Sequence, residues 1–560
     1  MSEKIQTITV SEFLTHAPFA PFTDGANGHH AGAFDRGTQT PFDAKGQISI
    51  DTSNDHLPTL NRLCWAAIQK GNEPPIMFRF GNTIVRTALN DKGAVWLQPV
   101  SPEIMRHHLS NWAHWHKNQM RFVKPPIEVI RDVLATLYID LPALSRIVAV
   151  PVFAADGSLR AEPGYNAASG VLYAPEPGFT ALPVPDQISA EDVAAANRLL
   201  CEDVLGDFPF ALTSDRDNAV ALFLLPFARD LIDGPTPNHL IEASMPASGK
   251  GKLVQALLGV SVGRDLGLLT PVRDDDEWRK QITSALIVGR QVILIDNVVH
   301  RLDSSALAAA WTADIWDDRI VGYKEKANMP VRCIWVMTGN NVAVSTELAR
   351  RCLRIRIQPA TDRPEELDHW RHPDLLPWCA EHRAELVRAA HVIIRWWIQQ
   401  GMPAAKFPRP LGSYERWTRV MGGILEAAGY TQFLTNYREF QGRADTERSA
   451  RALFCATWYD WTEMPGCDTR REGVSTSDLV PIAEGIEGLP IRGESPRALQ
   501  SSLGRWLKTN SDVFVEHQEE IAPGQTLARH FRIVIGKVRQ GKQQWVIEMH
   551  SKEVLKVLDS

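Results

Sequence analysis

The stretch NHLIEASMPASGKGK, residues 238–252, decides the fold class of this chain. Its first six residues favour a buried strand, and LVQALLG at 253–259 favours a helix. A strand, a loop of small residues, a lysine and a helix together form a phosphate-binding loop, in which backbone N–H groups and the helix N-terminus face the phosphates. Lys250 would neutralise charge on the β- and γ-phosphates. The alternative is an ordinary polar loop between a strand and a helix.

This loop departs from the usual pattern GxxxxGK followed by Ser or Thr. Ser244 stands where the first glycine is expected, and Gly251 stands where a hydroxyl side chain would bind Mg²⁺. The lysine and its context are retained. We therefore predict that the nucleotide is bound by Ser244, Ala247, Ser248, Gly249, Lys250, Gly251 and Lys252.

From residue 238 to residue 357, apolar strands alternate with helices, which is typical of a parallel α/β sheet. The run QVILIDN at 291–297 places Asp296 at the carboxyl end of a buried strand. P-loop enzymes hold Mg²⁺ at that position. Many buried strands end in Asp, so the indication comes from its position after Lys250, with one expected helix (274–288) between them.

The next apolar strand, VRCIWVM at 331–337, ends in a Thr-Gly-Asn-Asn sequence that contains Asn340. An amide here can orient the attacking water or touch the γ-phosphate, whereas the alternative is a plain turn. Arg350 and Arg351 then open another apolar strand. Paired arginines suit a finger that reaches a neighbour's nucleotide, and the alternative is a solvated helix face. Together, these elements in this order predict a P-loop ATPase.

Composition limits the remaining functions. The 560 residues are enough for several domains, and 44% hydrophobic with 22% charged residues is ordinary globular chemistry. The net charge of −6 is not that of a compact basic DNA-binding module. Seven scattered cysteines form no CxxC pair, which argues against zinc or disulfides and suits a reducing cytosol. We find no signal segment and no membrane-spanning run, so we expect a cytoplasmic protein.

The residues around these motifs resemble a known family. The stretches 294–341 and ELARRCLRIRI (347–357) are similar to the AAA+ helicase domains of phage and mobile-element replication proteins. These are the superfamily 3-like, primase-associated helicases, which are related to MCM-type ring helicases. The similarity continues through LGSYERWTRVMGGILEAAGYTQFLTN (411–436) and covers most of residues 55–470.

The resemblance implies a role for each matching residue. Lys250 would be the Walker A lysine, Asp296 the Walker B aspartate and Asn340 the sensor 1 residue. Arg350 or Arg351 would be the arginine finger. The cofactors would be ATP and Mg²⁺, with Asp296 holding the metal.

The segment RIVGYKEK at 319–326 matches the hairpin that precedes sensor 1 in ring helicases. There it projects into the central channel and grips DNA. Lys324 and Lys326 would then contact phosphates without reading sequence. The alternative is a solvated turn with alternating charges.

Two departures from the family pattern bear on catalysis and on partners. Asn297 stands where many relatives carry a catalytic Glu, and Asn can hold a water but cannot accept its proton. Asp303 and Glu347 are nearby candidates for the base. The first 58 residues are too few and too polar to form a primase domain, so a primase would be a separate partner.

The C-terminal segment is expected to be winged-helix-like. Ser495 and Pro496 suit the start of a helix that carries Arg497, Arg505 and Lys508. Two following strands flank a basic turn at 539–542, which would be the wing. DNA contact by the helix and the wing is one interpretation, and protein contact is the other.

The expected architecture is an α/β P-loop AAA+ core with three additions. Its parts are a flexible leader (1–58), an α+β N-terminal domain (59–188), the core with a helical lead-in (189–363), a helical domain (364–470) and the winged-helix-like domain (471–560).

The expected function is that of an ATP-dependent DNA helicase or translocase of phage or mobile-element replication. It would act on single-stranded or forked DNA as a ring, expected to be a hexamer. No membrane partner is expected. The alternative is an ATP-binding switch that binds DNA or a partner without unwinding, in initiation or antiphage defence. The absent hydroxyl ligand and Asn297 motivate this alternative, because both make hydrolysis slow.

Overall fold

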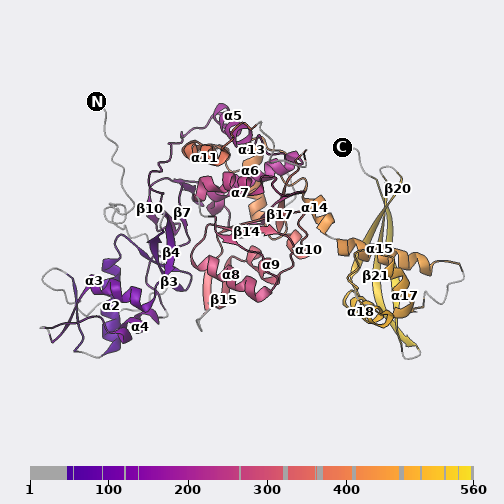
Figure 1. Ribbon diagram of the computed structural model, residues 1–560, viewed down its shortest axis with the longest axis horizontal. Coiled ribbons are helices and arrows are strands. Elements are labelled where there is room, and N and C mark those ends of the chain that lie inside the picture. Colours follow the sequence, from indigo (N-terminus) through magenta and orange to yellow (C-terminus); the bar gives the residue numbers. More distant parts are fainter. Residues whose placement is uncertain are drawn as a thin grey trace. The chain divides into compact units, whose positions relative to one another are not determined.

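The computed structural model describes residues 47–53, 56–90, 93–118, 121–136, 138–263, 266–319, 326–359, 361, 370–406, 411–444, 446–465, 472–491, 493, 495–522, 525–539 and 542–556 (Figure 1). The chain divides into two compact units, Met1–Tyr437 and Arg438–Ser560. Both contain helices and strands, so this is a mixed α/β protein. Among the helices described, none is both long and apolar enough to cross a membrane.

The first unit starts with a small sheet of β1 (Ile48–Asp51), β5 (Ala113–Lys117) and β6 (Arg121–Phe122). It shares a core with α2 (Leu57–Gly71), α3 (Pro102–Trp112) and α4 (Ile127–Leu134). The predicted leader reaches residue 58, whereas β1 lies inside it and pairs in parallel with β5. The folded region thus begins earlier than predicted, because a distant strand supplies the hydrogen bonds that so short a strand needs.

Apolar runs separated by a Gly-Asn turn and an Asp-Lys-Gly turn predict a strand meander at 76–98. The second sheet is such an antiparallel meander, formed by β2 (Met77–Phe80), β3 (Thr83–Leu89) and β4 (Val95–Pro99). The sequence also predicts one helix over about 101–117, but α3 ends at Trp112 and β5 follows. Ala113 and Trp115 are buried between less buried histidines, and this alternation suits a strand. Short strands complete the region: β7 (Arg146–Val148), β8 (Val152–Phe153), β9 (Leu159–Arg160), β10 (Gly164–Asn166) and β11 (Val171–Tyr173).

The centre of the first unit is a parallel five-stranded sheet in the order β13-β14-β17-β12-β18. Parallel strands cannot be joined by a tight turn, so helices connect them across the sheet. The carboxyl ends of all five strands therefore lie at the same edge. The strands are β12 (Asn238–Ala243), β13 (Leu268–Leu269), β14 (Val292–Val298), β17 (Ile334–Asn340) and β18 (Cys352–Ile357). The intervening helices are α7 (Lys250–Val262), α8 (Asp275–Ile287), α9 (Ser305–Thr312) and α10 (Thr346–Ala349).

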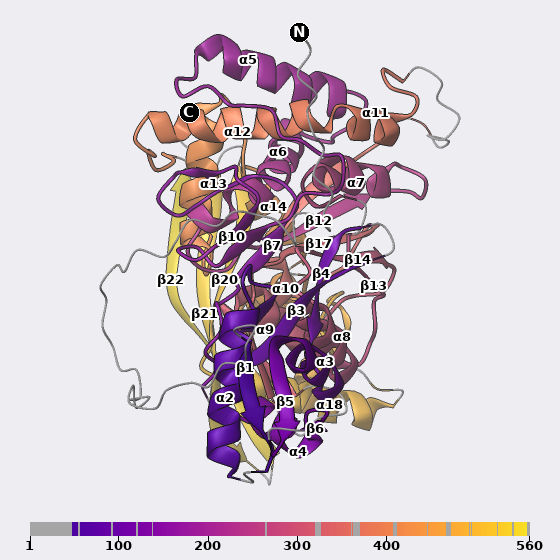
Figure 2. The same ribbon diagram turned by 90° about the vertical axis from the view of Figure 1, so that its left-hand side faces the viewer.

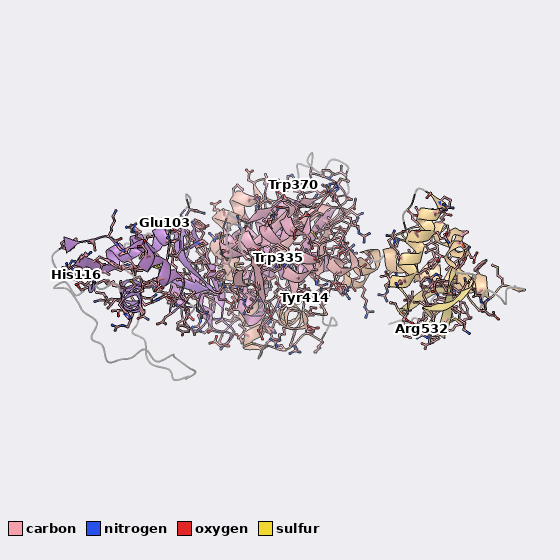
Figure 3. The ribbon with its side chains drawn as sticks, turned by 90° about the horizontal axis from the view of Figure 1, so that it is seen from below. Glu103, His116, Trp335, Trp370, Tyr414 and Arg532 are labelled. Atoms are coloured by element: carbon pink, nitrogen blue, oxygen red, sulfur yellow. The ribbon has the colours of Figure 1, made fainter. Side chains whose placement is uncertain are left out.

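Further helices cover this sheet. Figure 2 shows α5 and α12 side by side above α6 and α7, and Trp335 and Tyr414 lie in the interior (Figure 3). The helices are α5 (Ala190–Arg198), η1 (Leu199–Val204), α6 (Thr213–Ala228), η2 (Arg229–Leu231), α11 (Leu375–Glu381), α12 (Arg383–Gln399) and α13 (Glu415–Ala427).

The helical region predicted at 364–470 is divided between the two units. Trp397 of α12 and Trp417 of α13 belong to the same apolar core as the central sheet. Phe454 and Trp458 of α15 (Thr446–Thr462) belong to the core of the second unit. The division follows from which core each apolar face fills, and this is not visible from helical periodicity.

The second unit has a sheet in the order β19-β22-β21-β20. Its strands are β19 (Val474–Ser475), β20 (Phe514–Ala522), β21 (Gln525–Arg539) and β22 (Lys542–Lys556), and its helices after α14 (Tyr437–Ala444) and α15 are α17 (Thr476–Glu484) and α18 (Pro496–Thr509). The sequence predicts only a strand pair here. β20 is an additional edge strand whose polar sequence FVEHQEEIA hides it from hydrophobicity patterns.

Candidate functional site

The loop between β12 and α7 has a backbone that only small residues adopt easily. Ala247 and Gly249 have φ values of 58° and 86°, and α7 begins at the next residue, Lys250. The Ser248 hydroxyl donates to the carbonyl of Met245, which closes the loop from within. The first turn of α7 therefore directs its unpaired N–H groups toward the space above the loop, where an anion is favoured.

The Lys250 ammonium lies between this loop and the end of β17. Its Nζ donates to Asn340 Oδ1 at 2.6 Å and to the Met245 carbonyl at 3.3 Å. Partial burial lowers the pKa of Lys250, and the negative charge of Asp296 opposes that shift. The structure thus brings together three residues that the sequence predicts for the site.

Asp296 and Asn297 are exposed at the carboxyl end of β14, where the pairing with β17 is interrupted by a bulge. Thr338 on β17 binds both residues. Its hydroxyl donates to the Asp296 carboxylate and accepts the Asn297 N–H at 3.0 Å. Asn297 has a φ of 57°, which Asn tolerates better than most residues. Thr338 was not among the predicted residues; its signal is a hydroxyl at the end of an otherwise apolar strand.

Asn341 ties the end of β17 to the end of β12. Its N–H donates to Ala243 at 3.0 Å, and its side-chain amide donates to the Ser244 carbonyl at 3.2 Å. With a φ of 44° it turns the chain away from the sheet. The backbone carbonyl of Ser244, rather than its side chain, thus makes this contact. Asn341 is a second positioning residue, after Thr338, which the sequence pattern indicated only as part of a turn.

Gly251 and Lys252 lie exposed in the first turn of α7. A Cβ added at Gly251 would meet no atom within 4 Å. The absence of a hydroxyl ligand at this position is therefore not imposed by crowding.

The two arginines after α10 differ in their surroundings. Both pair with Glu347, and Arg351 also donates to the Glu347 carbonyl at 2.7 Å. The Arg350 side chain is 59% exposed, whereas that of Arg351 is 18% exposed. Arg350 is thus the one that can reach outward, while Arg351 is held against its own helix.

Glu347 is a poor candidate for the catalytic base. Burial alone would raise its pKa, but the hydrogen bond from Arg350 and the charges of both arginines outweigh burial and lower the pKa. A carboxylate held in this way accepts a proton less readily. The other candidate, Asp303, is exposed between β14 and α9.

The hairpin before β17 consists of β15 (Ile315–Arg319) and β16 (Lys326–Pro330). Lys326 is the first residue of β16, and Lys324 lies outside the described residues. The base of the hairpin is anchored on α8, since Trp316 Nε1 donates to Thr283 at 2.9 Å and Arg279 pairs with Asp318 at 3.0 Å.

In the second unit, α18 exposes its basic residues on one side. Arg497, Arg505 and Lys508 are exposed, while Leu503, Trp506 and Leu507 are buried. Arg539, the last residue of β21, is exposed and pairs with Glu472 at 2.6 Å. The exposed side of α18 is therefore available for a polyanion or an acidic partner.

The residues at the sheet edge fit a nucleotide triphosphate and a divalent cation. A lysine, a helix N-terminus and an exposed carboxylate are the usual partners of phosphate and Mg²⁺, which needs few protein ligands when phosphates supply the others. Over the described part of the chain, no group of three or more His, Cys, Asp or Glu side chains is placed to hold a metal ion.

No family model and no curated protein matches this chain. Two solved structures of JCV helicase, one of them bound to a substituted acetamide, are 16% and 15% identical to it. The matched regions cover 47% and 48% of this chain and 70% and 71% of the helicase chains, with TM-scores of 0.20 and 0.21. TM-scores this low lend no weight to either fold or function.

Proposed function

We propose that this chain is an ATP-dependent DNA helicase or translocase of the phage or mobile-element replication type, and that it acts as a ring. One observation carries the proposal: the Lys250 ammonium contacts Asn340 where β12, β14 and β17 end side by side, with Asp296 close enough to influence the lysine charge. Nucleotide binding at the carboxyl edge of a parallel sheet is the usual arrangement in α/β proteins.

Each residue would then have a defined task. Lys250 would exchange its contact with Asn340 for phosphate oxygens, which frees the Asn340 amide to hold a water. Asp296, kept in place by Thr338, would hold Mg²⁺, which supplies charge neutralisation on the phosphates when bound. Arg350 would enter the site of a neighbouring copy and stabilise charge in the transition state.

We further propose an AAA+ architecture for the core and a winged-helix architecture for the second unit. The sheet order, with the loop-bearing β12 between β17 and β18, supports the first. The succession of α15, β19, α17, α18 and the β21–β22 hairpin supports the second. The 319–326 hairpin would grip DNA through Lys324 and Lys326, and a primase would be a separate chain.

The second candidate is an ATP-binding switch without unwinding, which Gly251 and Asn297 favour. A DNA-stimulated ATPase assay separates the two functions, with Lys250→Ala as the control. Turnover that rises with DNA and disappears in the variant supports the helicase. ATP binding by the native chain with no turnover above the variant would sink it. A ring also predicts a mass increase with ATP and single-stranded DNA, and a persistent monomer would count against it.

A further inference from the structure

The segment at residues 430–437, here called the strap, leaves α13 and ends at the first residue of α14. It lies against α6 and β18 of the first unit. Three polar residues of α6, Asp215, Asp217 and Asn218, are completely buried. Buried polar groups of this kind are costly unless they are fully hydrogen-bonded, so their partners matter.

The α6 residues bind the strap at three successive points. Asp217 accepts the N–H of Gln432 at 3.0 Å, and Asn218 accepts the N–H of Leu434 at 3.1 Å. The side chain of Asn436 donates to Asp215 at 2.8 Å and accepts from Asn218 at 3.1 Å. The path of the strap is therefore determined by a buried hydrogen-bond network rather than by apolar contact alone.

The same α6 residues also bind β18. Asp215 accepts the N–H of Arg356 at 2.9 Å, and Asn218 donates to the carbonyl of Arg354 at 2.9 Å. One set of buried side chains thus holds both the strap and the strand that follows the paired arginines. The strap and the arginine-bearing turn have a common anchor.

The end of the strap contacts the arginine turn directly. The Tyr437 hydroxyl donates to the backbone carbonyl of Arg350 at 2.8 Å. Burial raises the pKa of Tyr437 to about 12, so the hydroxyl keeps its proton and remains a donor at neutral pH. Because Arg350 is the residue whose guanidinium faces outward, this bond acts on the backbone from which that side chain projects.

We propose that Tyr437 is a positioning residue for Arg350: through the strap, the buried network on α6 sets where the Arg350 guanidinium meets the nucleotide of a neighbouring copy. This inference rests on the proposed function, in which Arg350 acts on a neighbour's ATP. In this proposal Tyr437 acts through Arg350 and does not bind the nucleotide. Its effect should therefore appear in the rate of hydrolysis and depend on the presence of Arg350.

The test compares Tyr437→Phe, Arg350→Ala and the double variant in the full-length chain. Loss of one hydrogen bond is worth about 1 kcal/mol, so Tyr437→Phe should lower the kcat for ATP roughly fivefold. KM and ATP affinity should stay within about twofold, because the hydrogen bonds that hold the strap run to α6 and to the Arg350 carbonyl. In the Arg350→Ala background, Tyr437→Phe should have no further effect on kcat.

Tyr430→Phe is the matched control, since it removes a hydroxyl from the same strap. The Tyr430 hydroxyl donates to Asn197 at 2.8 Å and lies 3.3 Å from the Cys201 sulfur, away from the bond between Tyr437 and Arg350. Its kcat should equal that of the native chain, and the thermal midpoints of both Tyr variants show whether folding is intact.

The outcomes distinguish the inference from the proposed function. If Arg350→Ala lowers turnover to a small but measurable rate and Tyr437→Phe does not change it, the positioning role is wrong and the proposed function stands. If Tyr437→Phe lowers kcat equally with and without Arg350, the positioning role is also wrong. If Arg350→Ala leaves turnover intact, the arginine role fails and the inference fails with it.

Discussion

Single residues are the reason why we propose nucleotide binding, rather than fast hydrolysis, at this site. Thr338 orients Asp296, and Asn341 holds the start of the phosphate loop, so the binding geometry is well supported. The candidates for the base that abstracts a proton from water have less structural support. Asn297 cannot act as a base, and the Glu347 carboxylate forms ion pairs with both Arg350 and Arg351. Binding therefore depends on groups that are in place, whereas the identity of the base stays a prediction.

Gly251→Ser should restore a metal ligand. There is open space for a Cβ at this position, so the hydroxyl can be added without displacing a neighbour. We expect the Mg²⁺ concentration at half-maximal ATPase activity to fall about tenfold, equivalent to about 1.4 kcal/mol. Gly251→Ala adds the same Cβ without the hydroxyl and is the control. Equal Mg²⁺ dependence in the two variants would show that the position does not face the metal.

At the scale of elements, the hairpin β15–β16 is held from two sides. α8 binds β15, and the turn between β2 and β3 binds β16. Asn82 accepts the N–H of Asn328 at 2.9 Å and donates its own N–H to the Asn328 carbonyl at 3.3 Å. A hairpin proposed to move along DNA is thus connected to the sheet β2–β4 as well as to α8.

Gly81→Ala tests this connection. Gly81 has a φ of 60°, and an added Cβ would lie 1.5 Å from the Asn328 carbonyl oxygen, so the turn must separate from β16. Gly178→Ala is the control, since its φ is 84° but its Cβ would meet nothing within 4 Å. Both variants cost about 1 kcal/mol from backbone strain. Only Gly81→Ala should also speed amide exchange in residues 326–329, and equal exchange in the two variants would contradict the contact.

The exposed side of α18 makes a prediction about DNA. Arg505→Ala should weaken binding to DNA and reduce the slope of log affinity against log salt by about 0.9, if one phosphate contact is lost. Lys552→Ala removes an exposed charge from β22 in the same unit and serves as the control. Fluorescence anisotropy at several salt concentrations measures both. Equal slopes would favour the protein-contact alternative for the second unit.

At the scale of the whole molecule, the first unit is held together by long-range polar contacts as well as by its apolar core. His391 of α12 is completely buried, and its Nε2 donates to the Pro151 carbonyl at 2.8 Å. Burial lowers the pKa of His391 to about 4, against an ordinary value of 6.5. The folded state therefore excludes a proton that the unfolded state would take up.

The stability from neutral His391 is complete above pH 6.5 and is lost as the pH falls toward 4, because the unfolded state binds more protons in that window. The loss is at most about 3 kcal/mol. His391→Gln keeps a donor but cannot be protonated, so the urea midpoint of this variant should depend less on pH between 6.5 and 4. His56→Gln, at an exposed position, is the control. An unchanged pH slope for His391→Gln would contradict the assignment.

The sequence by itself determined the local parts of this protein. The strand–loop–helix at 238–259, the polar residues at the ends of β14 and β17 and the meander β2–β4 could be predicted, because each depends on neighbouring residues and their periodicity. Only the tertiary structure decided which strands lie beside β12 and that Glu347 pairs with both Arg350 and Arg351. It also decided which helices of 364–470 belong to the first unit and which to the second. These features join residues far apart in sequence through buried hydrogen bonds and core packing, which local patterns do not encode.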